Sequence, residues 1–376
     1  MVSCGEASGD LYAGALAAEL RALEPGIAIT GLGGERLAGA GASLVGDYRG
    51  LTVTGLAEAL KVLPRSYAMY RRLLAVARAQ RPDVLVAIDY PDFNFRLAAA
   101  MRRLGVPVVY YISPQLWAWR PGRMKTMRAI ASRVLVIFPF EERIYKDAGV
   151  PVTFVGHPLL DLVPAAPDPA AFLSSVGLQD GLRTIALLPG SRPNEVKQIL
   201  PTLVQAAARL AERGDVQFLL ARAPNLDESL FAPIAGARVP IAIVEGRTDD
   251  VLASADVVVT ASGTATVQAA LHDCPMVIVY RLSPLTYRLG KRFVTVDTYG
   301  MVNLIAGRRV APELIQEGLT VDAVMSHLRD LLDDPAAYAA AKLGLREVRA
   351  RLGTSGASRR AAEAVLAVAR VATVMR

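Results

Sequence analysis

Residues 84–94 read Val-Leu-Val-Ala-Ile-Asp-Tyr-Pro-Asp-Phe-Asn, a continuous apolar run followed at once by polar side chains. Such a short run without alternation is typical of a strand that is buried on both faces of a sheet. Between runs of this kind, the chain places apolar residues at helical spacing, for example in 67–80 and 201–213. The other strands that the pattern predicts are 108–112, 134–137, 152–155, 184–188, 216–220, 241–244, 257–260 and 276–280. Strands that alternate with helices predict an α/β protein with doubly wound parallel sheets.

The length and one proline-rich segment predict two main domains. The chain has 376 residues, enough for two or three domains. Residues 162–168 read Leu-Val-Pro-Ala-Ala-Pro-Asp and precede Pro169, so three prolines fall within six residues. Neither a helix nor a central strand continues through such a segment. We therefore predict an N-terminal domain at 1–163, a C-terminal domain at 169–350, and a last helix within 351–376 for which a return to the N-terminal domain is one alternative.

Composition excludes several classes of protein. Hydrophobic residues make up 53% of the chain and charged residues 20%, which excludes a disordered chain. The two cysteines, Cys4 and Cys274, are too few and too far apart for a disulfide scaffold or a thiolate zinc site. No apolar run approaches the ~20 residues of a membrane-spanning helix, and the start has no apolar signal-peptide core. These features favour a cytoplasmic protein.

The chain is basic, with a net charge of +7 and a pI near 9.5. This surplus suits nucleic acid, anionic lipid or phosphorylated small molecules. Nucleic acid is the weakest of these alternatives, because aromatic residues are only 6% and no named nucleic-acid motif is present.

Ligands of parallel sheets bind beyond the carboxyl ends of the strands, so the residues that follow each run are candidates for a site. Ser262-Gly263-Thr264 open a predicted helix that ends near Leu271. The N–H groups and positive dipole at such a start favour phosphate, although an ordinary Ser/Thr cap is the alternative. Pro189-Gly190-Ser191-Arg192 adds a glycine turn and an arginine that can bind phosphate in a bidentate way. Together the two loops predict a phosphate site in the second half.

Acidic residues gather at strand ends of the first half. Asp89 and Asp92 follow one predicted strand, and one of them could act as a general base. Capping of a helix by Asp92 and solvation of Asp89 are the alternative. Glu6 and Asp10 stand near a helix start, where a capping role is favoured.

His157 and Trp117 are further candidates in the first half. His157 lies between glycine and proline, and Trp117 shares a loop with Trp119. For both, a structural role and a ligand contact remain alternatives.

Several cofactor motifs are absent from the sequence. Residues 31–36 read Gly-Leu-Gly-Gly-Glu-Arg, with Arg36 where the third glycine of a dinucleotide fingerprint belongs. There is no P-loop, zinc-protease or nucleophile-elbow motif, and no two aspartates are spaced as D-x-D. We therefore expect no metal and no cofactor, with phosphate charge met by amides and arginine.

A segment in the first half combines apolar and basic residues. Residues 56–72 contain four cations and one acid, and their apolar side chains could insert into a membrane interface. The alternative is an amphipathic helix packed on the sheet. The candidate membrane contacts are Leu56, Leu60, Val62, Leu63, Arg65, Arg71 and Arg72.

Seven short motifs, in order, resemble the lipid-A-disaccharide synthase family, and the resemblance covers nearly the whole chain. They are G-E-A-S-G-D at 5–10, D-x-P-D-F-N at 89–94, W-A-W-R at 117–120, P-F-E at 139–141, F-V-G-H-P at 154–158, L-P-G-S-R at 188–192 and S-G-T-A-T at 262–266.

The resemblance implies a glycosyltransferase of the GT-B type, with two Rossmann-like domains that face an interdomain cleft. It implies an inverting reaction that joins UDP-2,3-diacylglucosamine to 2,3-diacylglucosamine 1-phosphate and gives a β-1,6-linked disaccharide 1-phosphate and UDP. It further implies a protein at the cytoplasmic face of the inner membrane, and it leaves a homo-oligomer open.

The resemblance also implies roles for single residues. Asp89 becomes the candidate base, with Glu6 beside it. The UDP site would comprise Ser191, Arg192, Ser262, Gly263, Thr264 and Gln268, although the family usually has Glu at the last position. Further substrate contacts would come from Ser8, Asn94, Trp117, His157 and Asn303.

Two other functions remain alternatives to this one. One is another GT-B enzyme of UDP-sugars, such as a peptidoglycan N-acetylglucosaminyltransferase or a UDP-sugar 2-epimerase. The other is a non-catalytic protein that binds a nucleotide sugar or a lipid.

Overall fold

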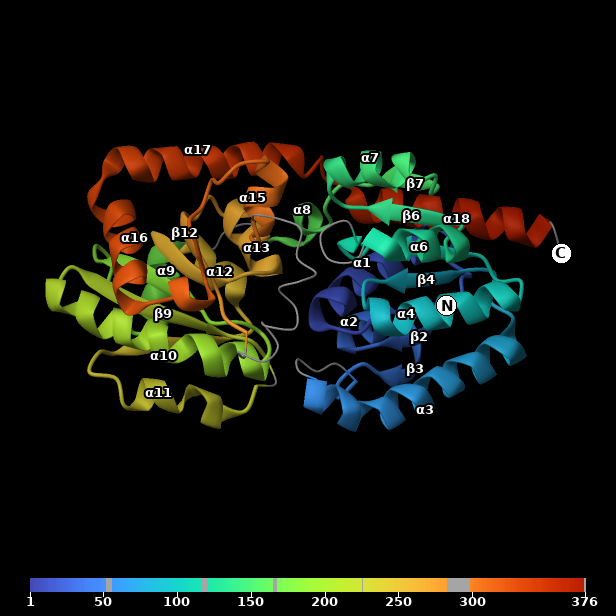
Figure 1. The fold of residues 1–376 in the computed structure, drawn as a ribbon, viewed down its shortest axis with the longest axis horizontal. Coiled ribbons are helices and arrows are strands. Elements are labelled where there is room, and N and C mark those ends of the chain that lie inside the picture. Colours follow the sequence, from blue (N-terminus) through green and yellow to red (C-terminus); the bar gives the residue numbers. More distant parts are fainter. Residues whose placement is uncertain (52–55, 117–120, 165–167, 225, 283–297, 375–376) are drawn as a thin grey trace. The chain divides into compact units, whose positions relative to one another are not determined.

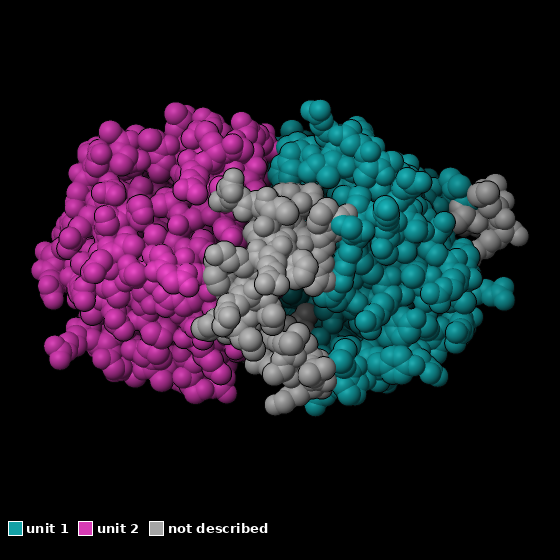
Figure 2. Space-filling view, in the orientation of Figure 1, with its two compact units in different colours: residues 1–162, 293–295, 352–376 teal, residues 163–292, 296–351 magenta. Residues whose placement is uncertain are grey.

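The apolar runs of the sequence become strands of two parallel sheets. The computed structural model describes residues 1–376 apart from 52–55, 117–120, 165–167, 225, 283–297 and 375–376. The chain divides into two compact units (Figures 1 and 2). Unit 1 contains Met1–Leu162 and Leu352–Arg376, and unit 2 contains the described residues between Val163 and Arg351.

In the described part of unit 1, seven parallel strands have the order β3-β2-β1-β4-β5-β6-β7. They are β1 (Val2–Ser3), β2 (Thr30–Gly33), β3 (Ser43–Asp47), β4 (Leu85–Ile88), β5 (Val108–Tyr111), β6 (Arg133–Val136) and β7 (Val152–Phe154). The helices are α1 (Ala7–Leu23), α2 (Glu35–Gly39), α3 (Leu56–Gln80), α4 (Pro91–Arg103), α6 (Met124–Ile130), α7 (Pro139–Asp147), α8 (Leu159–Leu162) and α18 (Ala357–Val374), with a 3-10 turn at Pro121–Arg123. Strand β4 is buried along its whole length, which explains its continuous apolar sequence.

In the described part of unit 2, six parallel strands have the order β10-β9-β8-β11-β12-β13. They are β8 (Arg183–Leu188), β9 (Val216–Arg222), β10 (Ile241–Glu245), β11 (Val257–Ala261), β12 (Met276–Tyr280) and β13 (Glu313–Ile315). The helices are α9 (Pro169–Ser175), α10 (Pro193–Leu210), α11 (Ala232–Ala235), α12 (Thr248–Ala253), α13 (Thr264–Leu271), α15 (Met301–Ala306), α16 (Val321–Asp333) and α17 (Pro335–Arg351); 3-10 turns span Ala211–Arg213, Glu228–Phe231 and Gln316–Gly318. The expected α/β fold with doubly wound parallel sheets is confirmed.

Helix α18 completes unit 1 although it is last in the sequence. It packs along α1 within that unit. The buried residues of α18 are mostly small, among them Ala357, Ala361 and Ala362, and α1 buries Ala13 and Ala17. Small side chains on both helices allow their backbones to approach closely.

Candidate active site

The carboxyl ends of β1 and β4 form the switch point of the unit 1 sheet. The two strands are neighbours, with Ser3 opposite Ala87, and the chain leaves them toward opposite sides of the sheet. Such a point is where ligands of open parallel sheets bind. Glu6 follows β1, and Asp89 follows β4. The sheet topology therefore supports the two acids that the sequence singled out.

Asn94 ties these two strand ends together. Its Nδ2 donates to the backbone oxygens of Ser3, Ile88 and Asp89 at 3.2, 3.2 and 2.9 Å. Ser3 Oγ donates in turn to Asn94 Oδ1 at 2.7 Å. The side chain of Asn94 is fully buried, and its hydrogen bond to the Asp89 oxygen positions the backbone of Asp89. The substrate contact that we expected of Asn94 stays a prediction.

Asp89 and the next residue, Tyr90, have left-handed backbones, with φ of 43° and 48°. This conformation is uncommon outside glycine, and strain of about 1–3 kcal/mol per residue persists only where neighbours hold it. Here Tyr110 Oη donates to the backbone oxygen of Asp89 at 2.8 Å. Burial, and next the charge of Asp89, raise the pKa of Tyr110 well above its ordinary value. The Asp89 carboxylate thus lies near a hydroxyl that stays protonated.

Tyr90 fills the space above Gly5. A Cβ at Gly5 would lie 2.2 Å from Cγ of Tyr90, so only glycine fits there. The Tyr90 hydroxyl donates to the backbone oxygen of Leu51 at 2.9 Å. Burial raises the pKa of Tyr90, and the negative charge of Glu6 adds to this effect. Glu6 is the N-cap residue of α1 but makes no side-chain capping bond. The charge of the Glu6 carboxylate therefore acts on the turn that carries Asp89 and Tyr90.

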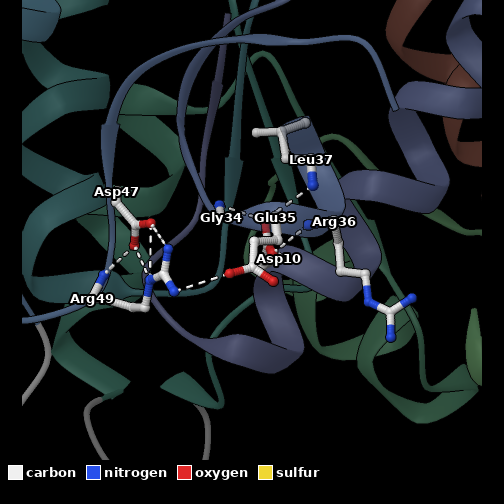
Figure 3. Close-up of polar contacts among 7 residues, drawn as sticks. All are labelled: Asp10, Gly34, Glu35, Arg36, Leu37, Asp47 and Arg49. Carbon is white, nitrogen blue, oxygen red and sulfur yellow. Dashed lines mark hydrogen bonds and ion pairs between the residues drawn. The ribbon is translucent and has the colours of Figure 1, made fainter. Parts of the chain in front are cut away.

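Asp10 binds the start of α2, whereas the sequence led us to expect a capping role at the start of its own helix, α1. Asp10 lies in the first turn of α1, and its carboxylate accepts hydrogen bonds from backbone N–H groups at the start of α2 (Figure 3). The donors are Gly34, Arg36 and Leu37, at 2.6, 3.0 and 3.2 Å. A Cβ at Gly34 would lie 2.7 Å from Asp10 Oδ2, so the glycine makes room for this carboxylate. The glycine-rich stretch that resembled a dinucleotide fingerprint thus serves an internal contact.

The other candidates of unit 1 are a buried histidine and residues near the start of a helix. His157 is buried, its Nδ1 accepts the N–H of Leu159 at 3.2 Å, and its ring meets Tyr12 edge-on. Burial lowers the pKa of His157 to about 3, so the ring is neutral near pH 7. Ser8 lies partly exposed in the first turn of α1. Trp117 lies outside the described residues.

Unit 2 has its own switch point, between β8 and β11. Leu188 lies opposite Thr260 near the ends of these strands, so the loops that follow them are neighbours. These loops contain Ser191 with Arg192, and Ser262 with Gly263 and Thr264. Thr264 is the first residue of α13, whose positive dipole end favours an anion. Both predicted phosphate loops therefore lie at the carboxyl ends of neighbouring strands in one sheet.

Glu195, which our sequence analysis missed, holds the first of these loops. Its Oε2 accepts the N–H groups of Ser191 and Arg192 at 3.1 and 3.3 Å, and Oε1 accepts from Arg192 Nη1 at 3.2 Å. Gly190 has φ of 124° and leaves no space for a Cβ beside Glu195. The signal was present, since a Glu at the third position of a helix is the pattern of a capping box.

Gln268 is joined to a carboxylate from a neighbouring helix. Its Nε2 donates to Asp249 Oδ1 at 3.2 Å, and His272 Nε2 lies 3.0 Å from the same oxygen. Asp249 belongs to α12, whereas Gln268 belongs to α13. The amide NH2 is therefore used inside the protein, and the orientation of the side chain is fixed.

Asn303 is buried and fully hydrogen-bonded. Its Oδ1 accepts the N–H groups of Val310 and Ala311 at 2.7 and 3.0 Å, and its Nδ2 donates to Glu313 Oε1 at 2.7 Å. Glu313 in turn accepts from the backbone of Tyr299, and Ser262 Oγ donates to the Tyr299 oxygen at 3.0 Å. Asn303 thus supports the loop of Ser262, and its substrate contact stays a prediction. Among the described residues, no cluster of three His, Cys, Asp or Glu side chains could hold a metal ion.

Two parallel α/β units, each with polar loops at its switch point, define a GT-B type protein. The fold is similar to that of the calicheamicin glycosyltransferase CalG4, with a TM-score of 0.59, 16% identity, and coverage of 98% of this chain and 96% of that one. It is also similar to the UDP-GlcNAc 2-epimerase of Neisseria meningitidis bound to UDP-GlcNAc, with a TM-score of 0.61, 13% identity and 88% of each chain covered. At these identities the likeness concerns the fold alone.

Sequence relatives identify the family within this class. The profile described as lipid-A-disaccharide synthetase matches residues 1–368. The lipid-A-disaccharide synthase of Geobacter sulfurreducens is 43% identical over 97% of this chain and 96% of its own length. That of Anaeromyxobacter sp. strain K is 44% identical over 98% and 97%. The chain belongs to the lipid-A-disaccharide synthase family and is a glycosyltransferase of lipid A biosynthesis. The expected family is confirmed, and the other two functions are set aside.

Proposed function

We propose that this chain transfers 2,3-diacylglucosamine from UDP to the 6-hydroxyl of 2,3-diacylglucosamine 1-phosphate. The new bond joins the acceptor O6 to the anomeric carbon of the donor, and the bond from that carbon to the diphosphate breaks. UDP leaves with the electron pair, and the anomeric configuration inverts. The observation that carries the proposal is the family match along residues 1–368, together with acids at the switch point of unit 1 and the loops predicted to bind phosphate at that of unit 2.

Asp89 is the proposed base, which accepts the proton of the acceptor hydroxyl. Hydrogen bonds from Asn94 and Tyr110 already fix the backbone of Asp89, so this backbone does not need to rearrange during the reaction. Glu6 adds negative charge beside it, as its effect on Tyr90 indicates. A carboxylate that is held in place but partly exposed suits proton transfer from a bound alcohol.

The loops of unit 2 are the proposed donor site. Ser191, Arg192 and the segment 262–264 would meet the diphosphate, and Gln268 would accept a hydrogen bond from the ribose. Glu195 supports this assignment because it fixes the backbone of the first loop and orients the Arg192 guanidinium. Preorganised donors of this kind are worth about 3 kcal/mol each when they meet developing charge.

A membrane surface is the proposed location, at the cytoplasmic face of the inner membrane. In α3, Leu63 and Tyr67 are 50% and 60% exposed, and Arg65, Arg71 and Arg72 are exposed beside them. Residues 62–80 contain no acid. Apolar side chains among cations suit contact with anionic lipid. Leu56 and Leu60 belong to the same helix. Within the described residues, no helix combines the length and the apolar character needed to cross a membrane.

The proposal is tested by comparing Asp89→Asn with Asp92→Asn. Asp92 is a matched control three residues later, in the first turn of α4, since its carboxylate is 74% exposed and pairs with Arg123 at 2.8 Å. Loss of a general base lowers turnover by about 10²–10⁴-fold. We expect this loss for Asp89→Asn, with an unchanged dissociation constant for UDP, and turnover within a few-fold of the parent for Asp92→Asn. Disaccharide formation is measured by mass spectrometry with both lipid sugars. Equal turnover in the two variants would refute the base assignment.

A further inference from the structure

A groove of about 1330 Å³ opens in unit 1, away from the candidate active site. Its walls come from the last residues of α3 and α4, from residues at the beginnings of β5 and β6, and from α18. All strands of this sheet are parallel, so the groove lies at their amino ends. Glu6 and Asp89 follow the carboxyl ends of β1 and β4, which are the opposite ends of the strands. Figure 1 shows the last turns of α3, α4 and α18 at one end of the unit.

The floor and rim of the groove are apolar. Eight of its lining residues carry apolar side chains, namely Ala77, Leu104, Val106, Pro107, Ala364, Ala367, Val368 and Val371. At the rim, Leu104 is 39% exposed and Val371 is 61% exposed. Large apolar side chains that remain exposed together mark an interaction site more often than single ones do.

The remaining charge in the groove is positive. Arg78, Arg81, Arg102 and Arg133 line it, and no acid is among its lining residues. Arg102 Nη1 donates to Ser132 Oγ at 3.3 Å, and Arg133 Nη1 donates to Thr153 Oγ1 at 3.0 Å. Hydroxyl partners are neutral, so these bonds hold the guanidinium groups without cancelling their charge. A ligand that carries both a negative group and apolar chains fits this combination.

The groove also continues the exposed side of α3. Leu63, Tyr67 and Arg71 are spaced by four residues, and Arg78 follows seven residues later, so all four share one side of the helix. Arg71 Nη1 donates to the Tyr67 hydroxyl at 3.5 Å, which links two members of this stripe. The helix has 25 residues, which corresponds to a length of roughly 37 Å. The stripe therefore leads from the proposed membrane contact into the groove.

We propose that this groove binds an anionic membrane lipid. Arginines hold the headgroup phosphate, and the apolar floor covers part of an acyl chain. The inference rests on the membrane location proposed above and adds a specific site to it. The groove lies at the amino ends of the strands, whereas Asp89 follows the carboxyl end of β4. This lipid is therefore distinct from the acyl sugars of the reaction.

The test measures cosedimentation of the full chain with phosphatidylcholine vesicles, with and without phosphatidylglycerol. The variant Arg78→Gln/Arg102→Gln removes two groove cations. Its matched control is Arg143→Gln/Arg346→Gln, which removes two exposed arginines outside the groove, 88% and 63% exposed. Each cation near an anionic surface contributes about fivefold to partition, so the double variant should lose roughly 25-fold. The parent and the control should bind phosphatidylglycerol vesicles equally.

A second pair of variants tests the apolar wall. Val371→Asp places a charge at the groove rim, and Leu343→Asp places one at an equally exposed site on α17. We expect weaker vesicle binding only for Val371→Asp.

Three results would overturn the groove site. The first is parent-like vesicle binding by the double groove variant, together with weaker binding by Arg71→Gln/Arg72→Gln; this would leave the membrane location standing. The second is no vesicle binding by the parent, which would also remove the membrane location. The third is a change of oligomeric state in the groove variants without a change in vesicle binding, which would assign the groove to a second copy. Loss of sugar transfer with intact vesicle binding would count against the proposed reaction alone.

Discussion

The contact between Gln268 and Asp249 changes how the proposed donor site can be understood. The family usually has Glu where this chain has Gln268, and the amide NH2 donates to the carboxylate of Asp249. Its Oε1 atom is the acceptor that remains for a ribose hydroxyl. In this chain a negative charge stands on the neighbouring helix at Asp249, where His272 also meets it.

We predict that Gln268→Glu weakens UDP binding in this chain. The change would place two carboxylates at hydrogen-bond distance, and like charges this close repel by about 1–4 kcal/mol. Affinity for UDP, measured by calorimetry, should fall about tenfold or more. In the Gln268→Glu/Asp249→Asn variant the donor and acceptor are exchanged, so affinity should recover. Tighter UDP binding by the single variant would contradict this account.

His157 predicts a pH dependence of stability. Burial lowers the pKa of its ring from 6.5 to about 3. Below pH 6.5 the unfolded chain therefore takes up a proton that the folded chain rejects, and stability falls as the pH decreases toward 3. The expected slope is about 1.4 kcal/mol per pH unit.

The measurement is urea unfolding of the parent, His157→Asn and His327→Asn between pH 7 and 4.5. An asparagine side chain does not titrate in this range, so His157→Asn should lose this component of the slope. His327→Asn should keep it, because His327 is partly exposed. Identical slopes for the parent and His157→Asn would show that the ring accepts a proton in the folded protein.

At the scale of elements, Asp10 joins α1 to the start of α2 (Figure 3). We predict that Asp10→Asn destabilises unit 1 by about 1–3 kcal/mol, because an amide cannot accept three backbone N–H bonds with full charge. Glu35→Gln is the control, since this exposed carboxylate is in α2, the helix that Asp10 contacts, and pairs with Arg49 at the surface. The comparison uses urea midpoints, and equal midpoints would argue against a structural carboxylate.

The strands show where sequence reasoning works and where it fails. All nine apolar runs form strands within two residues of the expected bounds. Seven of them are mostly buried, and burial on both faces demands a continuous apolar sequence, whereas β7 and β10 are partly exposed edge strands. The other four described strands, β1, β2, β3 and β13, are not among these runs, and β1 has only two residues. β2 contains two glycines, β3 is a partly exposed edge strand, and β13 has only three residues. None of them needs a long apolar run.

The candidate site divides in the same way. Strand-end position was enough to single out Asp89 in unit 1 and Arg192 in unit 2 as candidates, because ligands of a parallel sheet bind beyond the carboxyl ends of its strands. The supporting roles of Asn94, Glu195 and Asp249 depend on hydrogen bonds between segments far apart in the chain or on the shape of a turn. Periodicity does not record such contacts.

At the scale of the whole molecule, the last helix belongs to the first unit. Helix α18 packs on α1 and buries Val365 and Leu366, besides its alanines. Each of these two side chains contributes about 1.5–3 kcal/mol on burial, which is a large share of the stability of one domain. The same helix forms one wall of the groove in unit 1.

We predict that deletion of residues 357–376 loosens unit 1 and leaves unit 2 folded. Hydrogen exchange followed by mass spectrometry should show faster exchange in α1, β1 and β4, because α1 loses its packing partner. Exchange in β8 and β11 should stay slow and should slow further when UDP is added, since unit 2 has a hydrophobic core of its own. The full chain is the reference, and Leu343→Asp serves as a surface control. Faster exchange in β8 and β11, to the same extent as in β1 and β4, would mean that the two units unfold together and would contradict the separate cores.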